Sequence, residues 1–330
     1  MPDVSSDDWT IGRLIEWTRD FFARKGIDPP RLEAEILLAH VLGLARIDLY
    51  LRYEQEVDEP ERAALRDLVR RRTDGEPARY LVGTCEFMSL AFKVTPDVLI
   101  PRPETEMLVE EVIRRVRASA RMPLEDAADA AAQDDGAVQE AEASQATGAA
   151  ADTGSAAPAI IELCTGSGAV AVSLAVHLPG ARVTATDLSE AALAVARTNA
   201  EAHGVADRVV LLAGDLYDAL DAADARPADF LLANPPYVAE AEWNGLAPEI
   251  RGHEPRDALV AGPDGTEVIE RILKGARAYL KSGGAMLVEI GESQGRAVRE
   301  LAEQTRGLDE VAILKDYAGH DRVLSARRAP

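Results

Sequence analysis

Four consecutive residues with a clear chemical use, Asn234, Pro235, Pro236 and Tyr237, follow directly after the apolar run 229–233. A short apolar run that stops at Asn-Pro-Pro predicts the end of a buried parallel strand, because proline lacks a backbone donor and fixes φ. The Asn234 side chain is therefore expected at the edge of an α/β sheet where ligands bind. Its amide offers a carbonyl acceptor and an NH2 donor, and the backbone carbonyl of Pro235 is a second acceptor in a fixed place. This set fits a planar group that carries an NH2.

A glycine-containing turn follows the apolar run 159–163 and precedes a predicted helix. The turn consists of Cys164, Thr165, Gly166, Ser167 and Gly168. Glycine at a strand-to-helix junction lets a cofactor approach the backbone and the helix N-terminal amides. The next predicted strand, 182–186, ends in Asp187, nineteen residues after Gly168. That spacing suits a carboxylate that accepts hydrogen bonds from ribose hydroxyls, and it fits a nicotinamide dinucleotide as well as other nucleotide cofactors.

The tetrapeptide 234–237 resembles the motif shared by S-adenosylmethionine-dependent methyltransferases that act on planar nitrogens. In that motif Asn or Asp is followed by two prolines and an aromatic residue, and its position directly after a strand supports the resemblance. The same residues argue against a nicotinamide enzyme. A dehydrogenase needs no amide clamp, and no residue here resembles its proton donor.

Three further stretches, 86–90, 100–106 and 254–265, narrow the resemblance to the release-factor glutamine methyltransferases. The resemblance covers nearly the whole chain and implies the transfer of a methyl group from S-adenosylmethionine to the N5 amide nitrogen of a glutamine. That glutamine would lie in the Gly-Gly-Gln loop of a peptide-chain release factor. Asn234 and Pro235 would orient its amide, Pro236 would hold the turn, and Tyr237 would pack on the amide plane.

The resemblance also implies the residues that bind S-adenosylmethionine. They are Cys164, Thr165, Gly166, Ser167, Gly168, Asp187, Asp215, Leu216 and Asn234. Asp215 would accept from the adenine amine, and Leu216 would pack beside the ring. Cys164 departs from the family pattern, which has a glycine there, and a positive φ would strain a cysteine. The alternative, a nucleophilic cysteine, lacks an obvious histidine base, and direct methyl transfer needs no nucleophile from the enzyme.

These residues must be positioned by two predicted domains. Residues 1–83 are expected to form a helical substrate-recognition domain, 84–100 a β-hairpin linker, and 101–330 the methyltransferase domain. Apolar residues at helical spacing predict N-terminal helices that end near Gly26, near Gly43 and near Asp74.

The methyltransferase domain is predicted to be a Rossmann-like α/β fold. Its expected strands are 159–163, 182–186, 209–212, 229–233, 285–290, 311–315 and 322–325, and helices are expected from Pro103, after Gly168, at 266–280 and at 294–304. The resemblance implies a seven-stranded, mostly parallel sheet with one reversed strand near the end of the chain.

Residues 118–158 interrupt this domain with a sequence rich in Ala, Asp, Glu, Gly and Ser. Its acidic residues exceed its single arginine by seven, a third of the net charge of −21. Such a composition cannot bury enough apolar surface to offset its ordering entropy. The segment is predicted to be a disordered acidic insertion.

The composition narrows the class of protein. A chain of 330 residues with 47% hydrophobic and 28% charged residues is typical of ordinary soluble proteins and can hold two domains. No apolar run approaches the ~18 residues of a spanning helix, and the acidic N-terminus is unlike a signal peptide. Cys85 and Cys164 form no disulfide framework and lie in no metal-ligand spacing with a histidine. We expect a cytoplasmic monomer without a metal.

Three alternatives remain open at this stage. The substrate can be a glutamine of a ribosomal protein, or the chain can be an adenine-N6 nucleic-acid methyltransferase that uses a similar clamp on a flipped base. The net charge of −21 argues against direct nucleic-acid binding, because basic contacts to phosphates supply most of that affinity. A non-enzymatic adaptor that only binds S-adenosylmethionine would not need the intact clamp.

Overall fold

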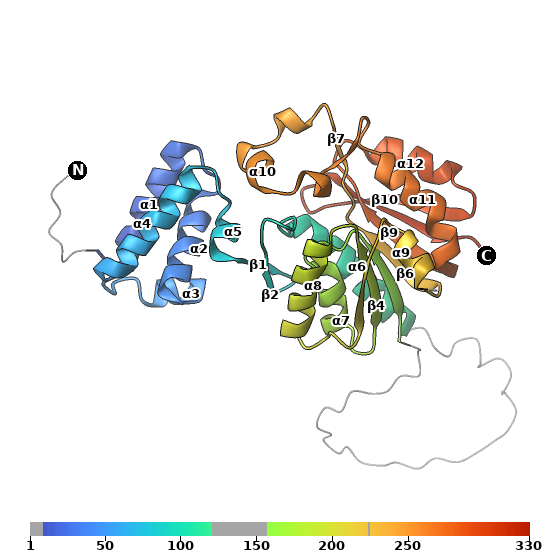
Figure 1. Ribbon diagram of the computed structural model, residues 1–330, viewed down its shortest axis with the longest axis horizontal. Coiled ribbons are helices and arrows are strands. Elements are labelled where there is room, and N and C mark those ends of the chain that lie inside the picture. The colour runs from blue at the N-terminus through green and yellow to red at the C-terminus, as the bar shows by residue number, and fades with distance from the viewer. Residues whose placement is uncertain (1–8, 121–156, 224) are drawn as a thin grey trace, which may run out of the picture.

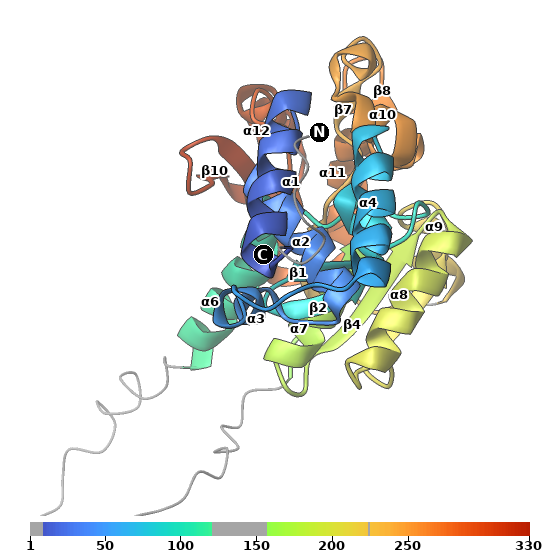
Figure 2. The same ribbon diagram turned by 90° about the vertical axis from the view of Figure 1, so that its left-hand side faces the viewer.

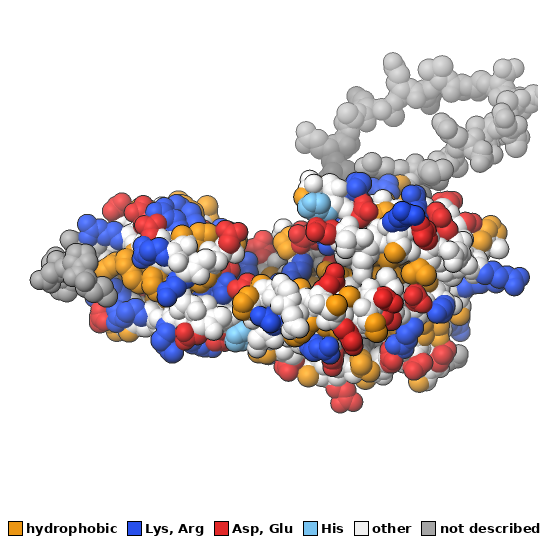
Figure 3. Space-filling model, turned by 90° about the horizontal axis from the view of Figure 1, so that it is seen from above, with side chains coloured by type: hydrophobic (Ala, Val, Ile, Leu, Met, Phe, Trp, Pro, Cys, Tyr) orange, Lys and Arg blue, Asp and Glu red, His pale blue; other side chains and the backbone are white. Residues whose placement is uncertain are grey.

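The computed structural model describes residues 9–120, 157–223 and 225–330. Figures 1 and 2 show a group of N-terminal helices on one side of a larger α/β body. In the space-filling view these parts form two lobes that meet at a narrower waist (Figure 3). In the described part of the chain, no helix has both the length and the apolar character needed to cross a membrane.

The N-terminal lobe is helical and has its own apolar core. Its helices are α1 (Ile11–Lys25), α2 (Pro30–Leu42), α3 (Arg46–Leu51), α4 (Glu59–Thr73) and α5 (Ala78–Val82). The three predicted helices are confirmed, and α1 and α2 end at Gly26 and Gly43 in the left-handed conformation. Helices α3 and α5 were not predicted, because six and five residues are too few to establish a helical period. The core of this lobe is formed by residues between Ile11 and Leu81.

A β-hairpin joins the two lobes, as predicted. It consists of β1 (Thr84–Phe87) and β2 (Leu90–Lys93), which pair antiparallel. Met88 and Ser89 turn the chain with φ of 51° and 60°, the left-handed angles that a two-residue hairpin loop requires. Phe87 and Phe92 are fully buried in the core of the α/β body. The hairpin is therefore anchored to this body.

The α/β body contains a seven-stranded mixed sheet. Its strands are β3 (Ala159–Leu163), β4 (Arg182–Asp187), β5 (Val209–Ala213), β6 (Ala228–Ala233), β9 (Leu280–Glu289), β10 (Leu308–Lys315) and β11 (Asp321–Arg328). They lie in the order β10-β11-β9-β6-β3-β4-β5. Strand β11 is antiparallel to both neighbours, and the other pairs are parallel, which confirms the predicted reversed strand near the end of the chain.

Helices cover both faces of the sheet. Helices α6 (Glu106–Ala120), α7 (Ala169–His177) and α8 (Glu190–Ala202) share one apolar core with one face, and α9 (Asp218–Ala222), α11 (Glu267–Tyr279) and α12 (Gly295–Gln304) share a second core with the other. Parallel strands buried on both faces are apolar at nearly every position. This explains why runs such as 229–233 showed no alternation.

Several boundaries differ from those expected. Strand β9 begins at Leu280, five residues earlier than predicted, because Leu280 already pairs with Ala228 while Gly283 and Gly284 interrupt the apolar pattern. Helix α6 continues to Ala120, inside the segment predicted as an insertion, and the rest of that prediction (121–156) lies outside the described residues. The chain after β6 also forms a short parallel pair, β7 (Val238–Ala239) with β8 (Val260–Gly262), and helix α10 (Pro248–His253).

Candidate active site

One cavity of about 540 Å³ lies at the carboxyl ends of the parallel strands β3, β4, β5 and β6. The predicted site residues that line it are Cys164, Thr165, Gly166, Ser167, Asp187, Asp215, Leu216, Asn234 and Pro236. Residues far apart in sequence meet here because neighbouring parallel strands end on the same edge of the sheet. The remaining predicted residues, Gly168, Pro235 and Tyr237, lie directly beside these in the chain.

The turn between β3 and α7 depends on left-handed backbone angles. Gly168 has φ of 77°, and a Cβ at this position would lie 3.0 Å from the Cβ of Ala196 on α8. Cys164, which stands where the family pattern has a glycine, has φ of 59°. The backbone therefore adopts at a cysteine the positive φ that favours glycine. Burial raises the pKa of the Cys164 thiol, which disfavours a reactive thiolate.

The carboxyl group of Asp187 is fixed at the end of β4. One oxygen accepts from the Gly166 backbone N–H at 2.8 Å and the other from the Ser189 N–H at 2.9 Å. Burial raises its pKa, while the two backbone donors favour the charged form. Each oxygen has a further lone pair, so the group can accept hydrogen bonds from a ligand in the cavity.

The end of β5 carries Asp215 and Leu216. A terminal nitrogen of Arg271, on α11, lies 2.8 Å from an Asp215 carboxylate oxygen and forms an ion pair that the sequence did not predict. Leu216 is buried and has φ of 51°. The ion pair uses one oxygen of the Asp215 carboxylate, and the second oxygen carries lone pairs for other donors.

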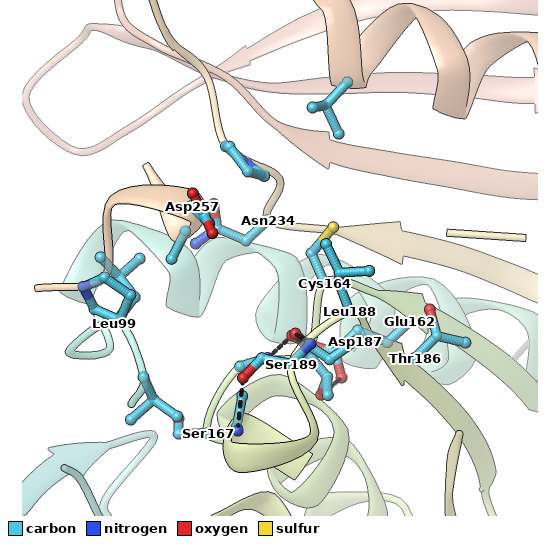
Figure 4. A pocket seen from close by; sticks show the side chains of 18 of the residues that line it. Leu99, Glu162, Cys164, Ser167, Thr186, Asp187, Leu188, Ser189, Asn234 and Asp257 are labelled. Carbon is cyan, nitrogen blue, oxygen red and sulfur yellow. Dashed lines mark hydrogen bonds between the residues drawn. The ribbon is translucent and has the colours of Figure 1, made fainter. Parts of the chain in front are cut away.

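Asn234 follows the last residue of β6 and faces the cavity (Figure 4). Its Nδ2 donates to the Thr105 hydroxyl oxygen at 3.1 Å, so its carbonyl oxygen is the end of the amide that remains for another donor. Pro235 is buried and Pro236 lines the cavity. The hydroxyl of Tyr237 lies 3.5 Å from a carboxyl oxygen of Glu289, at the end of β9.

The ends of strands β3, β4, β5 and β6 form one wall of the cavity. Another wall comes from the chain after α10 and from the segment after the hairpin. Asp257 and Asn234 both line this cavity, and Figure 4 shows them on the side away from Asp187 and Ser189. Glu254 is buried and holds these two segments together, because its carboxylate accepts from the Ile100 backbone N–H and pairs with Arg102.

Sequence reasoning missed five residues that shape the site: Thr105, Asn199, Asp257, Arg271 and Glu289. Thr105 and Asp257 lie within stretches that carry the family resemblance, which was the available signal. Asn199 is buried on α8 and donates both to the Ser167 carbonyl at 2.8 Å and to the Lys93 carbonyl at 3.1 Å. It thereby connects the glycine turn to the hairpin, and nothing in the sequence around position 199 indicates this contact.

Comparison with known proteins gives two domain matches and several full-length relatives. Residues 13–83 match the PrmC N-terminal domain, and residues 149–250 match the methyltransferase small domain. A release factor glutamine methyltransferase from Rhodopirellula baltica is 41% identical over 330 residues, which is 100% of both chains. A protein of the same name from Chlorobaculum tepidum is 41% identical over 318 residues, 96% of this chain and 97% of the relative. Another, from Geobacter sulfurreducens, is 38% identical over 319 residues, 97% of each chain.

Proposed function

This chain belongs to the release factor glutamine methyltransferase family, and from that premise we propose how its residues methylate the glutamine of the Gly-Gly-Gln loop. The enzyme transfers a methyl group to the N5 nitrogen of that side chain. An amide nitrogen is a poor nucleophile, because its lone pair is delocalised into the carbonyl group. The protein must therefore orient the amide and need not ionise it.

The observation that carries the proposal is the direction of the Asn234 amide. Its Nδ2 is bound to Thr105, so its Oδ1 is available to accept one N–H of a glutamine side chain. The backbone carbonyl of Pro235 is the second acceptor in the proposal. Two fixed acceptors would hold the glutamine amide in a single orientation, with its nitrogen directed at the methyl group. Such positioning lowers the entropic part of the activation barrier.

The described residues fit S-adenosylmethionine as the methyl donor. Gly166 lines the cavity and no atom within 4 Å would meet a Cβ at this position, so the turn is open to a ligand there, and Asp187 lines the same cavity. In the proposed arrangement Asp187 accepts from the ribose hydroxyls, and Asp215 and Leu216 contact the adenine. When bound, this cofactor supplies a methyl group on a positively charged sulfur.

The proposed chemistry leaves a proton to be removed from the methylated nitrogen. No general base is required before transfer, and the proton can leave to water or through a clamp carbonyl. The Asp257 carboxylate, which lines the same cavity as Asn234, would stabilise the positive charge that develops on the nitrogen. Tyr237 would pack on the amide plane, with its hydroxyl directed to Glu289.

We propose that the release factor binds across both lobes, since a single glutamine side chain offers too few contacts to select one protein. We also propose that the enzyme acts as a monomer, because one chain supplies every wall of the cavity. The proposed location is the cytosol, in keeping with two cysteines that are both free thiols.

The direct test is mass spectrometry of a release factor incubated with the enzyme and methyl-labelled S-adenosylmethionine. We expect one labelled methyl group on the peptide that contains the Gly-Gly-Gln motif, and no label when that glutamine is replaced by glutamate. Ribosomal proteins and an adenine-containing RNA are assayed in parallel. Label on either of these, with none on the release factor, would reject the proposed substrate.

A further inference from the structure

The side-chain amide of Asn234 has two ends of similar size, and only one orientation directs its carbonyl oxygen at a substrate N–H. The structure holds this orientation through Thr105, the last residue of a short 3-10 turn (Pro103–Thr105), whose hydroxyl oxygen accepts from Asn234 Nδ2. A hydroxyl can also donate, however. Thr105 can select one amide orientation only if its own proton is committed elsewhere.

The group that can take this proton is Glu289. Strands β6 and β9 are parallel and pair Ala233 with Val288, so Asn234 and Glu289 are the next residues along the two strands. Glu289 is 1% exposed, and the Thr105 side chain lies near enough to its carboxyl group to lower the pKa of Glu289 by hydrogen bonding. One carboxyl oxygen, Oε2, has no hydrogen-bond partner among the described residues. A buried carboxylate with so few donors strongly favours accepting the Thr105 proton.

Charged and titratable groups face Glu289 from each neighbouring segment. Arg322 on β11 stabilises the ionised form, whereas Glu104 beside Thr105 opposes it, and the Tyr237 hydroxyl lies within 3.5 Å. Burial is the largest influence and raises the pKa of Glu289 to about 7, against the lowering by Thr105 and Arg322. The protonation of this carboxyl group therefore changes near neutral pH.

We propose that Thr105 and Glu289 are positioning residues that fix the orientation of the Asn234 amide for the methyl-transfer reaction. The inference rests on the function proposed above and adds two residues to it. With Glu289 ionised, Thr105 donates to the carboxylate and accepts from Nδ2, which leaves Oδ1 for the substrate. With Glu289 protonated, the carboxyl group donates to Thr105, and the hydroxyl can donate to Oδ1 of a rotated amide. The NH2 would then face the substrate NH2, and the clamp would be lost.

The first test separates orientation from binding. Thr105→Val keeps the shape of the side chain and removes its hydroxyl, so we expect kcat to fall by about 10-fold to 100-fold. The dissociation constant for S-adenosylmethionine should change less than about two-fold, and Thr105→Ser should restore most of kcat. Ser173→Ala is the matched control, since it removes a buried hydroxyl of the same domain that has no partner in the described residues. A Thr105→Val enzyme with parent kcat would overturn the proposal.

The second test is the pH dependence of kcat. The active form has Glu289 ionised, so kcat of the parent should decline as the pH falls below about 7, approaching ten-fold per pH unit. Glu289→Gln cannot ionise and should lose this acidic limb while showing a lower kcat above neutral pH. An unchanged acidic limb in Glu289→Gln would show that another group controls it.

A measurement without substrate completes the test. In protein with 15N-labelled asparagine, the NH2 signals of Asn234 are assigned by their loss in Asn234→Ala. These signals should shift with a midpoint near pH 7 in the parent and stay constant in Glu289→Gln. If the parent enzyme methylates no release factor, the proposed function is wrong. The pH titration of the Asn234 signals still tests whether Thr105 and Glu289 orient the amide, because it needs no substrate. Signals of Asn234 that do not respond to pH would reject their role.

Discussion

In the candidate active site, the orientation of the side chains matters more than their chemical reactivity. The cavity contains a thiol at Cys164 whose pKa is raised by burial, and a carboxylate at Asp187 that is occupied by backbone donors. Neither is prepared as a nucleophile. Asn234 carries no charge, yet its oxygen is fixed by the strand before it and by Thr105. In the proposed mechanism, the rate therefore depends on where the acceptor oxygens point when positive charge develops on the substrate nitrogen.

The most specific residue-scale prediction concerns Asn234. Asn234→Ala should lower kcat by about 10² to 10³, equivalent to about 2.7 to 4 kcal/mol, the usual effect of removing one preorganised hydrogen-bonding group. Asn234→Asp keeps an acceptor, loses the donor to Thr105 and adds a charge, so it should retain partial activity above that of the alanine variant. Single-turnover methylation of a release factor measures both. Circular dichroism should report an unchanged fold, and a near-parent rate for Asn234→Ala would contradict the clamp.

The sequence predicts a site residue when the neighbouring sequence marks it. It does not predict a residue whose place depends on a contact with a distant segment. Asn234, Asp187 and the glycine turn could be identified, because each follows an apolar run and strand ends are the binding edge of this fold. Glu289 could not be, since its position beside Asn234 depends on the pairing of β6 with β9, two strands separated by 46 residues of chain. Arg271 lies in mid-helix and has no local pattern that would mark its contact with Asp215.

Elements also differed in how well the sequence predicts them. Helices α1, α2 and α4 have enough turns to show a period and end in recognisable caps, whereas α3 and α5 are too short. The start of β9 was missed because two glycines separate its first paired residue from its apolar part. Turn chemistry and periodicity predict most of the fold, while pairing between distant strands requires the folded chain.

The junction of β3 with α7 and α8 allows a matched comparison of two glycines. Gly166 and Gly168 both have positive φ, but a Cβ at 166 would meet no atom within 4 Å, whereas one at 168 would meet Ala196 at 3.0 Å. Gly166→Ala should therefore cost about 1 to 2 kcal/mol of unfolding free energy from backbone strain alone. Gly168→Ala should lose a further ~1 to 3 kcal/mol from crowding between the helices. Urea unfolding of the cofactor-free proteins measures both, and equal losses would exclude helix packing as the reason for Gly168.

At the scale of the whole molecule, the helical lobe is connected to the active site through a short chain of contacts. Arg72 on α4 is 4% exposed and lies 2.6 Å from Glu33 on α2 and 2.6 Å from Glu249 on α10. Figure 1 shows α10 between the helical lobe and the sheet. The residue after α10 is Glu254, which pairs with Arg102, and the next residues line the cavity. A change at the contact between lobes can therefore reach the wall beside Asn234.

The last prediction tests whether this contact serves substrate binding. Glu249→Gln removes one ion pair between the lobes and leaves Arg72 paired with Glu33, so the helical lobe should stay folded. Because Glu249 is partly exposed, we expect a loss of about 0.5 to 1 kcal/mol, or about two- to five-fold, as a higher KM for the release factor. The affinity for S-adenosylmethionine should not change, since the proposed cofactor residues lie at the ends of the strands and not in the contact between the lobes. The control is Asp67→Asn, which breaks an exposed pair with Arg70 within α4 and should leave KM unaltered. Steady-state kinetics with release factor as the varied substrate separates the two results. A Glu249→Gln enzyme with parent KM would mean that the position of the helical lobe contributes to stability and not to recognition.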